Sequence, residues 1–128
     1  MLAVDTNVLV RLVVEDDKLQ WARARRLFER EQVWIAKTVI LEAEWVLRSQ
    51  YEFEGKAIAR VLRRLAGLEN VHVEDPFVVS QALDWLEAGI DFADGLHLAS
   101  RDGATAFVTL DKQFVKRAAR LGVTTRQP

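Results

Sequence analysis

The sequence contains no cysteine and only two histidines, and no apolar run approaches the length of a membrane span. The absence of cysteine excludes disulfides and thiolate metal sites, and it fits a reducing cytosol. Because there are also so few histidines, a zinc site is not expected. Asp5 also interrupts the amino-terminal apolar run where a signal peptide would have to continue. We therefore expect a cytoplasmic protein without a membrane segment.

The chain also lacks a strong charge of one sign, since 18 basic and 19 acidic residues give a formal net charge of −1. This balance gives no indication of a polyanionic partner, and it remains compatible with a locally charged cleft. Hydrophobic residues make up 50% of the 128 positions. A chain of this size buries about two-thirds of the surface that its unfolded form exposes. No repeat, low-complexity tract or linker divides it, so we expect one domain over residues 1–128.

Short apolar segments alternate with helical patterns along the whole chain. Strands are expected at 2–4, 33–35, 71–73, 106–109 and 123–124, and helices near 7–14, 18–31, 39–49, 56–65, 76–88, 92–101 and 112–121. Helix caps are expected at Thr6 or Asn7, at Thr38 and at Asp75. The alternation predicts an α/β fold in which helices cover both faces of a parallel sheet.

The first expected strand is buried and delivers Asp5 at its carboxyl end, where open α/β sheets bind their ligands. Most acids on a soluble helix pair with a base three or four residues away. Glu44 does so, because Arg48 lies four residues further along, but Glu42 projects from an otherwise apolar helix face without a base. Asp94 and Asp111 also lack a local cation. These four acids could point into one cleft at the carboxyl ends of the strands.

Carboxylates that converge without bases repel one another, and a divalent cation would relieve the repulsion. Mg²⁺ and Mn²⁺ prefer such hard oxygen ligands, and they support phosphoryl chemistry by activating water and stabilising the leaving oxygen. Plainer interpretations remain open: Asp91 and Asp111 as helix caps, Asp94 in a favourable first turn, and Asp5 as a loop acid. Glu42 has no such explanation. The arginines of the second helix usually form a solvated face, and a nucleic-acid groove is the alternative.

Four motifs occur in order: Val4-Asp5-Thr6-Asn7-Val8-Leu9, Leu41-Glu42-Ala43-Glu44-Trp45-Val46-Leu47-Arg48, Asp91-Phe92-Ala93-Asp94-Gly95-Leu96-His97-Leu98-Ala99 and Val108-Thr109-Leu110-Asp111. Each is weak alone, but together they span almost the whole chain. The chain resembles a PIN domain, and more narrowly the VapC-type toxins of bacterial and archaeal toxin–antitoxin pairs. In the family pattern the middle acid precedes the tryptophan by three residues, which selects Glu42 over Glu44. The third motif carries over Asp94, with Asp91 as a possible accessory acid.

The resemblance implies a parallel sheet of about five strands sandwiched between helices, and a Mg²⁺- or Mn²⁺-dependent endoribonuclease. Asp5, Glu42, Asp94 and Asp111 would hold one or two ions, and the products would be a 5′-phosphate and a 3′-hydroxyl. Asn7 and Thr109 would orient these acids by hydrogen bonds. The expected contacts with RNA phosphates come from Arg11, Arg48 and Lys112. The family also implies a homodimer and a cognate antitoxin that blocks the site.

Two alternatives keep the PIN fold and change the function. One is a nuclease of RNA processing or DNA repair that has no antitoxin, and the other is a non-catalytic binding module. A haloacid-dehalogenase-like phosphatase also begins with an aspartate after a strand, but it requires a second aspartate two residues on. Asn7 occupies that position, so we discount this class.

Overall fold

Three short parallel strands form the central sheet of the protein, described here from a computed structural model of all 128 residues. They are β1 (Leu2–Ala3), β2 (Val33–Ile35) and β3 (Val71–Val73), in the spatial order β1-β2-β3. Within β2 and β3 the first and third residues are buried, as a strand with one face on the core requires. All three strands lie where the alternation of apolar segments predicted them.

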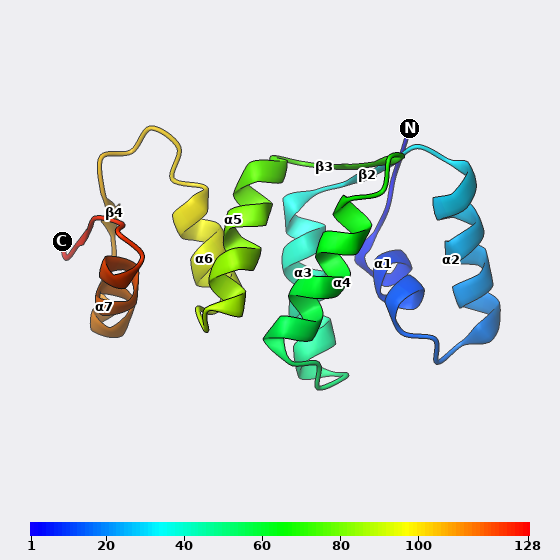
Figure 1. Cartoon of the computed structure of the whole chain (residues 1–128), viewed down its shortest axis with the longest axis horizontal. Coiled ribbons are helices and arrows are strands. Elements are labelled where there is room, and N and C mark those ends of the chain that lie inside the picture. The colour runs from blue at the N-terminus through cyan, green and yellow to red at the C-terminus, as the bar shows by residue number, and fades with distance from the viewer.

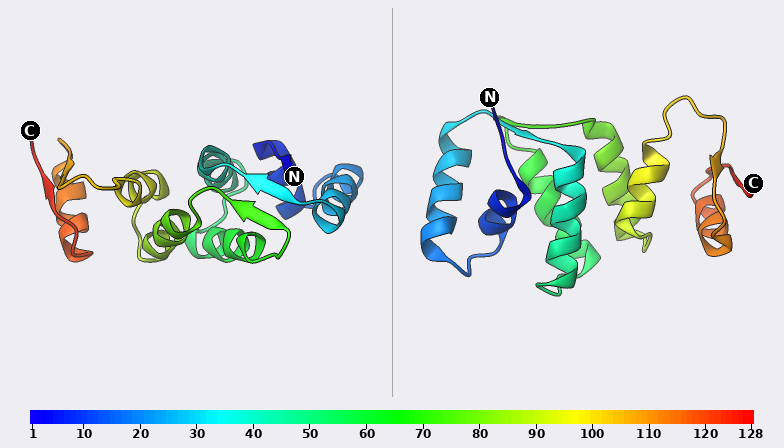
Figure 2. Two further views of the ribbon diagram at one scale, coloured as in Figure 1. Left: turned by 90° about the horizontal axis from the view of Figure 1, so that it is seen from above. Right: turned by 180° about the vertical axis from the view of Figure 1, so that it is seen from behind.

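Seven helices surround the strands. Their bounds are α1 (Thr6–Val13), α2 (Lys18–Arg30), α3 (Lys37–Ser49), α4 (Gly55–Ala66), α5 (Pro76–Glu87), α6 (Phe92–Ala99) and α7 (Lys112–Arg120). Seen from above, α1 and α3 lie on one side of the central sheet and α4 lies on the other (Figure 2). The α/β class, the parallel strands and their helical cover are thus confirmed. None of these helices combines the length and the apolar character needed to cross a membrane.

The remaining two strands pair with each other and do not join the central sheet. β4 (Phe107–Val108) and β5 (Thr125–Arg126) form a separate parallel pair. The single sheet of about five strands is therefore a wrong expectation, because the five strands divide into sheets of three and two. β1 consequently has a free outer edge, and Leu2 is 45% exposed where a buried strand was expected.

The hydrophobic core consists of a large cluster and a small one. The large cluster of 20 buried residues lies between the central sheet and α1 to α6, and includes Leu9, Ile35 and Phe92. The small cluster of 5 joins Trp85, Ile90 and Leu98 to Phe114 and Ala118 of α7, and so attaches the carboxyl-terminal segment to α5 and α6. The termini lie toward opposite ends of an elongated molecule (Figure 1).

Several helix ends differ from expectation. Asp5, not Thr6 or Asn7, caps α1, and α3 follows Ala36 without any side-chain cap. Asp75 does precede α5, but it adopts a left-handed conformation with φ 46°, and its carboxylate pairs with Lys37 Nζ at 2.8 Å instead of capping the helix. The Asp75 carboxylate, which the local pattern predicted to cap α5, thus pairs with Lys37.

Candidate functional site

Asp5 stands where β1 leads into α1. Its Oδ1 accepts a hydrogen bond of 2.8 Å from the Thr6 backbone N–H, and its side chain is exposed. Thr6 itself is buried, at 6% exposure. The short strand and the helix start therefore fix the direction of the Asp5 carboxylate, which was predicted to mark the site.

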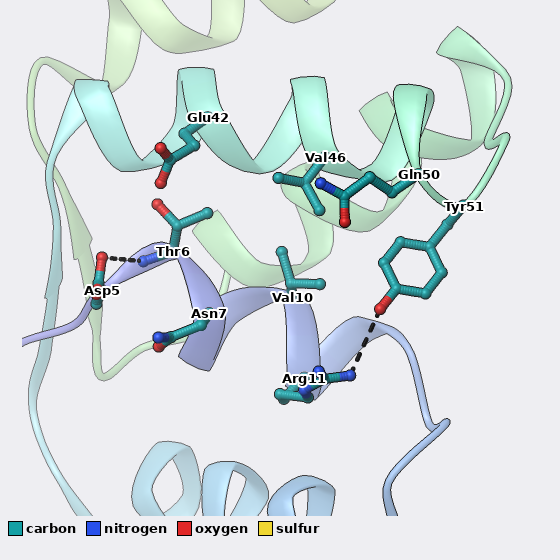
Figure 3. A pocket seen from close by; sticks show the side chains of 9 residues that line it. All are labelled: Asp5, Thr6, Asn7, Val10, Arg11, Glu42, Val46, Gln50 and Tyr51. Carbon is teal, nitrogen blue, oxygen red and sulfur yellow. Dashed lines mark hydrogen bonds between the residues drawn. The ribbon is translucent and has the colours of Figure 1, made fainter.

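A cavity of about 260 Å³ opens beside Asp5, between α1 and α3. Glu42 reaches toward it from α3, on the side opposite Asp5, and Thr6 lies between the two acids (Figure 3). Tyr51 and Gln50 close the other end. One acid that caps α1 and one from within α3 thus line one cavity, and neither forms an ion pair.

Glu42 and Glu44 have opposite environments although they lie two residues apart on α3. Glu42 is exposed toward the cavity. Glu44 is buried, and Arg48 Nε donates to its Oε2 at 2.9 Å while Nη2 donates to Oε1 at 3.4 Å. The structure therefore leaves Glu42 available for chemistry and uses Glu44 to hold the helix together. This difference agrees with the prediction that only Glu44 has a local base.

Asp91 and Asp94 lie at the start of α6, and Asp111 directly precedes α7. Asp91 caps α6, accepting from the Asp94 N–H at 3.2 Å. Burial raises the pKa of the Asp94 carboxyl. The negative charges of Asp91 and Asp111 raise this pKa further, so the three carboxylates lie within electrostatic reach of one another.

Asp111 also serves as a helix cap. Its Oδ1 accepts from the backbone N–H groups of Gln113 at 3.0 Å and Phe114 at 3.1 Å. The Thr109 hydroxyl oxygen accepts from the Asp111 backbone N–H at 3.0 Å. Thr109 therefore orients the main chain at Asp111 and does not bond its carboxylate. Asn7 lines the cavity beside Asp5 and forms no side-chain hydrogen bond.

The four predicted acids thus occur as two pairs, Asp5 with Glu42 and Asp94 with Asp111. No three acids or histidines surround a point that could hold a metal ion. The physical reason is the division of the sheet, because the carboxyl ends of β1 and β4 do not adjoin within one sheet. A single four-acid site remains a prediction.

Helix α3 packs against both α1, which Asp5 precedes, and α6, which carries Asp94. A second hollow of about 440 Å³ runs along it, with Glu42, Trp45 and Arg48 on one wall and Ala93 of α6 on the other. Ala93 precedes Asp94 in the chain. The charge of Asp91 also contributes to raising the pKa of the Arg48 guanidinium, although the hydrogen bond to Glu44 contributes most. A continuous surface therefore leads from Glu42 to the first turn of α6.

The three predicted phosphate contacts have different partners. Arg11 Nη1 pairs with Asp16 Oδ1 at 2.6 Å, and this bond is the main cause of its raised pKa. Arg48 is engaged with Glu44, as described above. Lys112 is exposed and forms no ion pair. Only Lys112 has its positive charge free of an acidic partner.

The sequence interpretation missed Tyr51. Its hydroxyl donates to Asp16 Oδ2 at 3.1 Å and accepts from Arg11 Nη1 at 3.4 Å. These contacts link the loop after α3 to the end of α1 at the rim of the cavity (Figure 3). The chain has a single tyrosine, and its position in a polar loop was the available signal, because a tyrosine whose ring packs against the core still needs a partner for its hydroxyl.

The donor chemistry of these residues fits a hard divalent cation. All four acids offer carboxylate oxygens and none forms an ion pair. The pKa of Asp94 is raised first by burial and then by the negative charges of Asp91 and Asp111. Mg²⁺ keeps several waters and often takes only one or two carboxylates from the protein. A pair of acids is therefore a sufficient set of ligands.

The family model described as PIN domain matches residues 2–120. Comparison with curated proteins and comparison with solved structures each found no match.

Proposed function

The chain belongs to the PIN domain family, whose fold is of the nuclease type, and on this premise we propose that it is a Mg²⁺- or Mn²⁺-dependent endoribonuclease. The observation that carries the proposal is the cavity between α1 and α3, which is lined by Asp5 and Glu42, two acids that form no ion pair. We further propose that it acts as the toxin of a toxin–antitoxin pair.

In the proposed reaction, water attacks phosphorus in line, the bond to the 3′ oxygen breaks, and the 3′ oxygen takes up a proton. Asp5 with Glu42, and Asp94 with Asp111, would hold one or two such ions. A bound divalent cation supplies positive charge to the transferring phosphoryl group and to the attacking and leaving oxygens. One of the carboxylates would receive the proton of the attacking water.

Purified protein should cut single-stranded RNA in the presence of Mg²⁺ or Mn²⁺ and should stop when a chelator is added. Asp5→Asn and Asp94→Asn should abolish cleavage, because each removes a negative charge and keeps the shape of the side chain. Glu69→Gln is the matched control, since Glu69 is exposed and lies outside both hollows. Equal cleavage by wild type and Asp94→Asn would refute the assignment.

The non-catalytic alternative draws support from the same acids, because Asp5, Asp91 and Asp111 all act as helix caps. Calorimetric titration with Mn²⁺ separates the two functions. A nuclease should bind the ion with an affinity that falls in Asp5→Asn, whereas a binding module should show no binding that depends on these acids. A nuclease of RNA processing or DNA repair would cut without an antitoxin, so the adjoining reading frame distinguishes it from a toxin.

The proposed partners are a second copy of the chain and an antitoxin. Support comes from large apolar side chains that the single chain leaves uncovered, among them Phe77 at 89% and Leu110 at 81% exposure. Light scattering coupled to size exclusion measures the mass in solution. A mass of 14.6 kDa would indicate a monomer and would contradict the homodimer.

A further inference from the structure

A groove lies between α1 and α2, which pack side by side (Figure 1). We call it the α1–α2 groove; its cavity of about 530 Å³ has Asn7 and Arg11 on one wall and Gln20 and Arg23 on the other. Val8 and Leu27 supply apolar lining. Asn7 and Arg11 also line the cavity that contains Asp5 and Glu42, so the groove and the acid cavity adjoin.

Arg23 is the free cation of this groove. Its side chain is exposed and has no acidic partner. Arg11 is different, because Asp16 already pairs with it. Arg25 is different too, since it pairs with Glu29 at 2.7 Å and lies over the Trp21 ring at 5.3 Å. The positive charge of the groove therefore depends on Arg23.

Two more arginines extend this charge along α2. Arg26 and Arg30 follow Arg23 at three and seven residues, a spacing that places all three on one side of a helix. Both are exposed and neither forms an ion pair. The exposed side of α2 thus carries a row of guanidinium groups without acidic partners, and Arg23 is the member of this row that lines the groove.

The composition of the groove matches a single-stranded polynucleotide. A guanidinium group binds a phosphate through two parallel N–H donors. Apolar lining next to a positive wall accommodates an unpaired base or sugar while the backbone follows the charge. An acidic protein segment would also meet the charge, but a polynucleotide in addition accounts for the way the groove leads to the acids that would hold the catalytic cation. A strand on Arg23 would continue to Asp5 and present a phosphodiester there.

We propose that the α1–α2 groove binds the phosphate backbone of a single-stranded RNA segment through Arg23, next to the scissile bond. This inference rests on the proposed nuclease function and adds a binding site that holds the substrate before cleavage. Arg23 is a binding residue and takes no part in the chemistry. Its contribution is therefore measurable without metal and without turnover.

The test is fluorescence anisotropy of a labelled oligouridine with the full chain in chelator, repeated at several salt concentrations. Arg23→Gln should raise Kd by about tenfold, because a charged hydrogen bond to phosphate is lost at an exposed site. The slope of log K against log salt should decrease by about 0.7, the contribution of one phosphate contact in a single strand. Arg25→Gln is the matched control and should change neither quantity.

The outcomes separate the two proposals. Equal Kd and equal salt slope in Arg23→Gln and wild type would overturn the groove, even if the protein cuts RNA. A lower affinity in Arg23→Gln without any cleavage by wild type would support the groove and refute the nuclease. Polyglutamate serves as the second probe: binding of it that depends on Arg23, without binding of oligouridine, would overturn the RNA site in favour of an acidic protein segment.

Discussion

Replacing Arg48 by methionine is expected to destabilise the fold substantially, although the residue is on the surface. The Glu44 side chain is 2% exposed and the Arg48 side chain is 47% exposed. Arg48→Met keeps the aliphatic stem and removes both hydrogen bonds to Glu44. The substitution therefore leaves a carboxylate buried in α3 without a partner, and this is the costly half of a buried ion pair.

Breaking a fully buried pair costs ~3–5 kcal/mol when one charge stays behind. Here water can approach through the half-exposed position of Arg48, so we expect the free energy of unfolding to fall by about 2 kcal/mol. For a chain of this size that corresponds to a drop in Tm of about 8 °C. Glu44→Leu should cost under about 1 kcal/mol, because the arginine that it leaves behind can turn into solvent.

The double variant Glu44→Leu/Arg48→Met should recover most of the lost stability, since it removes the charge together with its partner. Urea unfolding followed by circular dichroism measures all three variants on one scale. If Arg48→Met lost less than Glu44→Leu, the buried carboxylate would not be the source of the cost. The explanation would also fail if the double variant were no more stable than Arg48→Met.

Three further predictions follow from burial, titration and capping. Phe92→Ala should lower the free energy of unfolding by about 4 kcal/mol, because Phe92 is fully buried. Phe77→Ala should change it by less than about 0.5 kcal/mol, because Phe77 is exposed. Urea unfolding measures the stability of both variants. Because the folded-state pKa of Asp94 is raised above 3.8, the folded chain binds the proton more tightly, and this stabilisation is lost as pH rises through the folded-state pKa. Asp94→Asn should therefore raise Tm at neutral pH in chelator and leave it unchanged below pH 3.8; an equal shift at both would contradict this. Asp111→Ala should lower the free energy of unfolding by about 1 kcal/mol, because α7 loses its cap, whereas Asp111→Asn keeps the cap. Urea unfolding measures both variants, and an equal loss of stability in the two would count against the capping role.

Local patterns predicted the elements of the fold well. Strands β2 and β3 match their expected bounds, and α2 and α7 each end within one residue of expectation. Gly89 and Gly122, with φ of 92° and 75°, end their helices as glycine does at such positions. The period of apolar residues depends on neighbours in the chain, and this is why it could be read from the sequence.

Pairing between distant segments could not be predicted in the same way. β5 begins two residues later than expected, and its partner is β4. Which edges pair depends on the packing of the small cluster around Phe114, and that cluster draws on residues of three helices. The sequence pattern of a strand predicts that the strand exists, but it does not predict with which other strand it pairs.

The candidate site shows the same division between local and distant information. The sequence by itself determined which acids lack a base, since the bases that matter lie one helical turn away, and it separated Glu42 from Glu44 correctly. The tertiary structure alone decided that Glu42 shares a cavity with Asp5 and that Tyr51 lies at its rim, with neither Asp94 nor Asp111 among the residues that line it. The physical reason is that a cavity forms where elements distant in sequence pack together. The charges along a helix, in contrast, follow directly from the order of its residues.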